Sequence, residues 1–165
     1  MVSNASGPGL TDTDESGVSV SRLYREMVGG VADAGGDDAV EQRAEAILST
    51  VTDSLFDDDF AFDEATVKAN LDEILLMLVA LRESQTHGKG LMEDLERVFG
   101  AELSPGTVYP RLHELEEEGA LQVQELVRTK EYRIDDFELC REEVEAAMRQ
   151  HLALGFFFKA ALDDL

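Results

Sequence analysis

The hydrophobic period of this 165-residue chain changes after Gly119, and that change constrains the fold more than any other feature. From about position 20 up to Gly119, apolar residues recur at steps of three and four, the spacing of amphipathic helices. Between positions 120 and 134, apolar and polar residues alternate on both sides of the polar tip at 128–130, which predicts a β-hairpin. Beyond position 136 the helical spacing returns. The sequence therefore predicts a mainly α fold with one small hairpin.

Three helices are predicted directly before the hairpin, over residues 64–84, 90–99 and 105–118. Asp63 is placed to cap the first helix, and Gly100 is suited to end the second because glycine tolerates a left-handed backbone. Ser104 can cap the third helix, and Pro105 suits its first position. Three helices followed by a hairpin are the plan of a winged helix-turn-helix, so we expect such a domain at 63–135.

The residues before this domain divide into two predicted parts. Residues 1–19 are rich in Gly, Ser, Thr and Asp, so we expect a disordered acidic tail. Residues 20–62 carry two further helical patterns, at 21–34 and 38–55, which form an N-terminal helical extension. The acidic run Asp57-Asp58-Asp59 between them and the domain is read as a solvated turn, since it lacks the glycine and glutamate of a calcium loop.

The last segment, 136–165, is predicted to be one long helix that joins two copies of the chain. Its apolar positions alternate at steps of three and four, as in a helix that packs on a partner helix. The predicted dimerisation residues are Val144, Ala147, His151, Leu154, Phe158 and Ala161. Phe156, Phe157 and Phe158 make this helix apolar on nearly all sides, so we expect a core or dimer contact there, with the N-terminal helices packed over it.

The charge of the chain indicates a halophilic source. Acidic side chains number 36 against 14 basic ones, the net charge is −22, and the acids are spread over every segment. Mutual repulsion on such a surface is screened within about 3 Å at 1 M salt. The alternative is an ordinary acidic protein that binds a basic partner. An acidic balance normally argues against binding nucleic acid, but that argument weakens at very high salt.

Cysteine content and hydropathy place the chain in the cytoplasm. Cys140 is the single cysteine, so no disulfide can form within the chain. The N-terminus has neither the basic stretch nor the apolar core of a secretion signal. The longest apolar run, 74–81, is too short to cross a bilayer.

One stretch of the predicted domain resembles a known family. Positions 87–121 read HGKGLMEDLERVFGAELSPGTVYPRLHELEEEGAL. This stretch resembles the PadR-like family of transcriptional regulators in its His-Gly turn with a second glycine two residues on, in Leu-Ser-Pro-Gly-Thr-Val-Tyr-Pro and in Leu-Glu-Glu-Glu-Gly. The resemblance covers roughly residues 74–134. It implies a DNA-binding regulator that dimerises through its C-terminal helix, with 105–118 as the recognition helix.

The predicted recognition helix assigns roles to individual residues. Its apolar stripe turns inward, which leaves the N-terminal half exposed and suited to the major groove. Arg111 could bind guanine through two hydrogen bonds, and basic residues of the neighbouring turn and wing could reach phosphates. We expect the acidic run at 114–118 to lie away from DNA. The candidate DNA-binding residues are Lys89, Ser104, Thr107, Tyr109, Arg111, His113, Arg128 and Lys130.

No pattern in the sequence indicates catalysis, a cofactor or a metal. The histidines at 87, 113 and 151 and Cys140 have no ligand spacing, and no nucleophile stands near a base. The predicted function is a homodimeric regulator of transcription that binds double-stranded DNA. The alternative is a protein-interaction module derived from a winged helix that no longer binds DNA. Target genes, the direction of regulation and any small-molecule effector are left open by the sequence.

Overall fold

The computed structural model describes residues 43–56, 60–82 and 86–165, all within the unit Ala34–Leu165. The predicted tail 1–19, the predicted helix 21–34 and the predicted turn Asp57–Asp59 lie outside the described residues.

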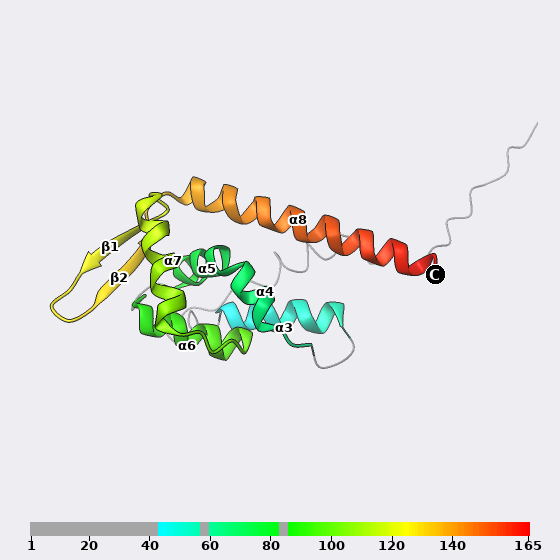
Figure 1. Cartoon of the computed structure of the whole chain (residues 1–165), viewed down its shortest axis with the longest axis horizontal. Helices are drawn as coiled ribbons and strands as arrows, with labels where there is room; N and C mark the ends of the chain where they lie inside the picture. Colours follow the sequence, from blue (N-terminus) through cyan, green and yellow to red (C-terminus); the bar gives the residue numbers. More distant parts are fainter. Residues whose placement is uncertain (1–42, 57–59, 83–85) are drawn as a thin grey trace, which may run out of the picture. The chain divides into compact units, whose positions relative to one another are not determined.

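The described part of the chain is mainly helical with one antiparallel hairpin, as predicted (Figure 1). Its elements are α3 (Arg43–Leu55), α4 (Glu64–Ala69), α5 (Leu71–Leu81), α6 (Gly88–Phe99), α7 (Pro105–Glu117), β1 (Leu121–Glu125), β2 (Lys130–Ile134) and α8 (Phe137–Asp163). Helices α5, α6 and α7 followed by the hairpin make up a winged helix-turn-helix. This confirms the fold class.

The helix predicted over 64–84 is two helices, α4 and α5. Asn70 separates them because its backbone leaves the helical region, at φ −119° and ψ 25°. The side-chain nitrogen Nδ2 of Asn70 donates to the backbone carbonyl oxygen of Thr66 at 2.8 Å, a local bond that competes with the helix. Asp63 caps α4 as predicted, since its carboxylate accepts from the Thr66 amide at 2.9 Å.

The boundaries of α6 follow from two residues that cap it. The helix begins at Gly88, two residues earlier than predicted, because His87 Nδ1 accepts the Gly90 amide at 2.9 Å. It ends at Gly100, whose φ of 65° is the left-handed conformation predicted for that glycine. His87 is therefore the N-cap of α6 rather than part of an isolated turn.

Helix α7 begins at Pro105 as predicted, but the predicted role of the Ser104 side chain is wrong. No side-chain cap bond forms at Ser104; its hydroxyl lies 3.1 Å from that of Thr107. The backbone carbonyl of Ser104 accepts from the amides of Thr107 and Val108 instead. The start of α7 is therefore fixed by its backbone and by proline at the first position.

The core of the domain gathers around α5. This helix contacts α6, α7, α8 and β2. The largest fully buried side chains come from five elements and are Val67, Leu75, Leu76, Leu91, Leu95, Val108, Leu112, Leu115 and Leu121. Burying each such leucine or valine contributes about 1.5–3 kcal/mol, so these contacts hold α7 in place.

The wing is tied to the turn before α6 as well as to itself. Strands β1 and β2 pair with Leu121 opposite Ile134 and Val123 opposite Tyr132. The Tyr132 amide donates to the Thr86 carbonyl at 2.9 Å, and the Thr86 hydroxyl donates to the Tyr132 carbonyl. Residues Thr86 and His87 therefore pair along the outer edge of β2.

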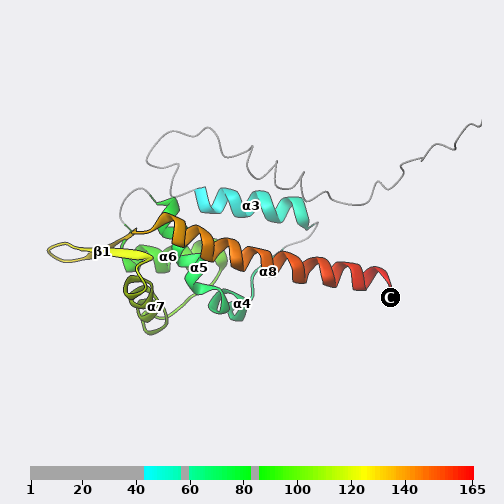
Figure 2. The same cartoon turned by 90° about the horizontal axis from the view of Figure 1, so that it is seen from above.

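Helix α8 packs on the domain only along its first part. Cys140 is buried, and Leu139 and Val144 pack against the core. Figures 1 and 2 show the helix running past α5 and continuing beyond it, and every residue from 151 to 165 is exposed. Helix α3 contacts α5 and α6. Within one chain, α3 therefore does not cover the phenylalanines at 156–158, contrary to the expectation for the helix predicted at 38–55.

Candidate nucleic-acid interface

The start of α6, the face of α7 that carries Tyr109, His113 and Glu116, and the wing enclose a groove of about 880 Å³, called the α7–wing groove below. It is lined by His87, Gly88, Lys89, Glu93, Tyr109, His113, Glu116, Arg128, Thr129, Lys130 and Tyr132. Five of the predicted DNA-binding residues lie in this lining: Lys89, Tyr109, His113, Arg128 and Lys130. The groove thus brings together residues from positions 89 to 130.

Gly88 allows the ring of Tyr109 to lie against the start of α6. A Cβ at position 88 would stand 2.4–2.7 Å from three atoms of the Tyr109 side chain, closer than real contacts allow. The ring packs where that Cβ would be, and Tyr109 is still 42 % exposed. The first glycine of the His-Gly-Lys-Gly motif therefore positions an aromatic side chain in the groove.

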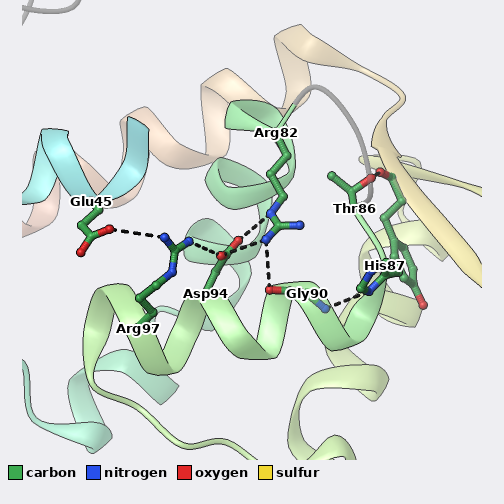
Figure 3. A network of polar contacts seen from close by, with 8 residues as sticks. Glu45, Arg82, Thr86, His87, Gly90, Asp94 and Arg97 are labelled. Carbon is green, nitrogen blue, oxygen red and sulfur yellow. Dashed lines mark hydrogen bonds and ion pairs between the residues drawn. The ribbon is translucent and has the colours of Figure 1, made fainter. Parts of the chain in front are cut away.

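Gly90 makes room for a buried ion pair behind the same turn (Figure 3). A Cβ at this position would lie 2.8 Å from an Arg82 guanidinium nitrogen. Arg82 donates to both carboxylate oxygens of Asp94, at 2.6 and 2.9 Å, and the two side chains are 10 % and 5 % exposed. The pair fastens the end of α5 to the middle of α6, so it supports the turn that carries the groove.

The same carboxylate extends the network to α3. Arg97 donates to Asp94 at 2.6 Å and to Glu45 at 3.3 Å (Figure 3). Arg97 and Glu45 are both exposed, so this outer pair is screened by solvent far more than the inner one. Helix α3 is thereby joined to the helix that precedes the recognition helix.

Arg111 lies on the side of α7 that faces α5. Its guanidinium donates through Nε to Asp72 at 2.7 Å, donates through Nη2 to the second Asp72 oxygen, and pairs with Glu114 at 2.6 Å. The hydrogen bond to Asp72 raises the pKa of Arg111. A base contact by Arg111 requires release of this pairing, so its assignment stays a prediction.

Ser104 and Thr107 stand at the first turn of α7, outside the lining of the α7–wing groove. Their hydroxyl groups contact each other, and Ser104 is exposed. The amides of Thr107 and Val108 in this turn donate to the Ser104 carbonyl, so the turn offers its hydroxyl groups and the positive end of the helix dipole to phosphate.

The cations of the groove lie close to carboxylates of the same chain. Lys89 is 3.7 Å from Glu93, and Lys130 is 3.4 Å from Glu125. In the described part of the chain, the Arg128 guanidinium has no carboxylate within 4 Å. Each lysine of the groove therefore has one carboxylate beside it, whereas Arg128 at the wing tip has none among the described residues.

One carboxylate of the acidic run of α7 lines the groove, although the run is expected to lie away from DNA. This carboxylate is Glu116, and it lies 3.5 Å from His113. Glu117 approaches the other ring nitrogen of His113 at 3.6 Å. These positions are one to two turns from Tyr109 on the same helix, so they share its face.

The predicted dimerisation residues fall into two groups. Val144 packs on the core of its own domain, and Ala147 is half-buried. His151 lies 2.5 Å from the Asn70 side-chain oxygen, so it is held by its own chain. The remaining members, Leu154, Phe158 and Ala161, are exposed.

Among the described residues, no three His, Cys, Asp or Glu side chains are grouped as metal ligands. No described helix is long and apolar enough to cross a membrane. Burial raises the pKa of the Cys140 thiol, and the neighbouring Glu143 adds to that shift.

Comparison with known proteins adds a family and several relatives. Residues 76–137 match the profile of the Transcriptional regulator PadR-like family. The transcriptional activator GvpE of Haloferax mediterranei is 44 % identical over 102 residues, which are 62 % of this chain and 53 % of that protein. The activators GvpE1 and GvpE2 of Halobacterium salinarum are 44 % and 37 % identical over 61 % and 57 % of this chain, and over 52 % and 48 % of their own lengths.

These matches span about half the length of the curated relatives. The relatives come from halophilic archaea, in agreement with the halophilic source that the charge of the chain predicts. The family and the relatives are named as regulators of transcription rather than as enzymes, in agreement with the sequence prediction. Residues 76–137, from α5 to the start of α8, are thus similar to the Transcriptional regulator PadR-like family.

Proposed function

We propose that this chain is a cytoplasmic regulator of transcription that binds a pseudo-palindromic operator as a homodimer. The observation that carries the proposal is the α7–wing groove, in which residues of α6, α7 and the wing meet on one face. In winged helices, the recognition helix enters the major groove while neighbouring segments contact the sugar–phosphate backbone. The named relatives favour activation over repression.

The proposed base contacts come from the exposed N-terminal half of α7. Thr107, Tyr109 and His113 carry hydrogen-bonding side chains there, and Tyr109 is held in place by Gly88. The helix start also offers the positive end of the helix dipole to phosphate.

The proposed backbone contacts come from Lys89 on α6 and from Arg128 and Lys130 on the wing. All three side chains are exposed, and they approach the groove from its two edges. Contacts of this kind fix the position of DNA but carry no sequence information.

The proposed dimer forms through the end of α8. Phe156, Phe157, Phe158 and Leu162 expose 47–65 % of their surface, and no other described element covers them. A second copy of this helix can bury the stripe around Leu154 and Phe158. In this arrangement each chain supplies one recognition helix for one half of the operator.

The test of DNA binding uses fluorescence anisotropy with a duplex from upstream of the chain's own gene and a scrambled duplex, between about 0.5 and 3 M KCl. We expect a preference for the promoter duplex. Replacing Lys130 or Arg128 by Ala should weaken binding to both duplexes alike and reduce the salt slope by about 1. If the wild type prefers neither duplex at any of these salt concentrations but purifies with a protein partner, the interaction-module alternative replaces this proposal.

The role of Arg111 needs a matched pair of variants. If Arg111 reads a base, Arg111→Ala removes about 1–3 kcal/mol of discrimination at one operator position, while Asp72→Asn keeps that discrimination. If Arg111 instead fixes α7 on α5, both variants weaken binding to all sequences alike. Comparing the two variants on a set of single-base operator changes separates these roles.

A further inference from the structure

We propose that Glu93 and Glu125 act as guard carboxylates of the α7–wing groove: each holds a phosphate-binding lysine and lowers the affinity of the groove for DNA of any sequence. The proposal rests on the proposed DNA-binding function and names residues that set its strength. It begins from the observation that the lysines on both edges of the groove have carboxylate partners in their own chain.

The geometry places each guard beside one lysine. Glu93 lies one helical turn after Lys89 on α6, with Nζ and Oε1 3.7 Å apart. Glu125 ends β1 opposite Lys130 at the start of β2, with Nζ and Oε1 3.4 Å apart. A phosphate that binds either lysine must therefore replace a carboxylate that is already next to it.

The cost of that exchange is small and similar for every DNA sequence. Both guards are largely exposed, at 63 % and 76 % of their side-chain surface, so each pair is weak. Non-specific binding depends almost entirely on phosphate contacts, whereas specific binding also has base contacts from α7. The guards therefore remove a larger share of the binding free energy from non-specific DNA than from an operator.

Arg128 is a cation of the same groove that has no guard carboxylate among the described residues, so it can be compared with the two lysines. It lines the same groove, and no carboxylate of the described residues lies within 4 Å of it. An unguarded cation at the wing tip can begin phosphate contact, while the two guarded lysines add to binding only once the duplex is seated. Removing a guard should therefore change the behaviour of its own lysine and leave Arg128 unaffected.

The experiment measures binding of a scrambled duplex and of the promoter duplex at 0.5 M KCl by anisotropy, with the full chain. We expect Glu93→Gln and Glu125→Gln each to raise affinity for scrambled DNA about two- to fivefold, in keeping with the strength of an exposed ion pair. The slope of log affinity against log salt should become steeper by up to about 0.9 per freed lysine. The promoter duplex should gain by about the same factor, because the exchange costs the same for every sequence.

A cycle of variants tests whether each guard acts through its lysine. In a Lys89→Ala background, Glu93→Gln should give no gain beyond that of Glu142→Gln, an equal charge change at an exposed position of α8 outside the groove. The same holds for Glu125→Gln in a Lys130→Ala background. Circular dichroism in the assay buffer checks that the fold is kept.

Three results would overturn the inference. Equal gains with and without the lysine would show only the long-range effect of net charge. No gain over Glu142→Gln would show that the pairs do not compete with phosphate. A wild-type chain that binds neither duplex would overturn the proposed function itself, and that result is visible before any variant is compared.

Discussion

The turn that leads into α6 and the end of α8 differ in how their side chains are packed within one chain. At the turn, Arg82, Asp94 and Gly90 are joined in a buried polar network, and Thr86 is bonded to the wing. At the end of α8, large apolar side chains remain exposed along the residues from 151 onward. The first region is complete within one chain, whereas the second has apolar surface to bury. Substitutions should therefore affect folding in the first region and assembly in the second.

The largest expected effect tests the first region. Asp94→Ala removes the carboxylate of a buried ion pair, so we expect a loss of about 3–5 kcal/mol in the free energy of unfolding. Urea unfolding in molar KCl, followed by circular dichroism, measures this loss. Glu45→Gln breaks only the outer, exposed pair and should cost less than about 1 kcal/mol. Equal losses for the two variants would contradict the account of a buried network.

The second prediction tests the end of α8. Leu154→Asp places a charge on an exposed side chain of one chain, so folding of the single chain should be unchanged. If that side chain is buried by a second copy, dimerisation should weaken by about 1.5–3 kcal/mol, more than tenfold in the dissociation constant. Light scattering in molar KCl should give twice the mass of one chain for the wild type and less for the variant. A wild-type monomer would overturn the proposed assembly.

The third prediction compares two glycines near α7. Gly88→Ala forces the Tyr109 ring out of its place, which destabilises the fold, whereas alanine favours the helix more than glycine does. The net loss in the free energy of unfolding should be about 1 kcal/mol. Gly106→Ala meets only the Ser104 hydroxyl at 3.8 Å, so it should cost nothing. Thermal unfolding of both variants measures the difference. In a Tyr109→Ala background the cost of Gly88→Ala should disappear, because the clashing ring is gone.

The smallest effect concerns Glu143, on the first part of α8. Burial raises its pKa above the usual 4.5, and the nearby carboxylates Glu118, Glu73 and Asp72 raise it further. Because the folded chain holds this proton more tightly than the unfolded chain, protonation of Glu143 stabilises the fold at low pH. This stabilisation is lost as pH rises through the raised pKa. Glu143→Gln should therefore stabilise the chain slightly at pH 7 and not at pH 4. Glu142→Gln, at an exposed position, is the control in the same urea titrations.

Hydrophobic period predicted most of the fold because it reports which face of each element is buried. The change of period after Gly119 predicted the hairpin, and the stripe of α7 is buried as expected at Val108, Leu112 and Leu115. The break at Asn70 was missed because apolar spacing continues through it. A single side-chain bond to Thr66, invisible to periodicity, divides the helix there.

The candidate site was predictable in its location but not in its charges. The motif around Gly88 and Gly90 indicated the right turn, but its physical reason is contact with Tyr109 and Arg82, which only the packing of α5, α6 and α7 reveals. The partner of Arg111 lies 39 positions away on another helix. In a chain with 36 acidic residues, many carboxylates could have filled that role. Pairing between helices therefore had to come from the structure.

Helix α8 would also set a length scale for the proposed operator. It has 27 residues and starts three positions after the wing, so it is a rod about 40 Å long from the hairpin to the exposed end. In a dimer joined at that end, the rod fixes how far apart, and at what rotation, the two recognition helices meet the double helix. One residue inserted between Val144 and Leu154 would turn the two ends by about 100°, whereas four would nearly restore the phase. The spacing of the operator half-sites would then be encoded in the length of one helix, away from every residue that touches DNA.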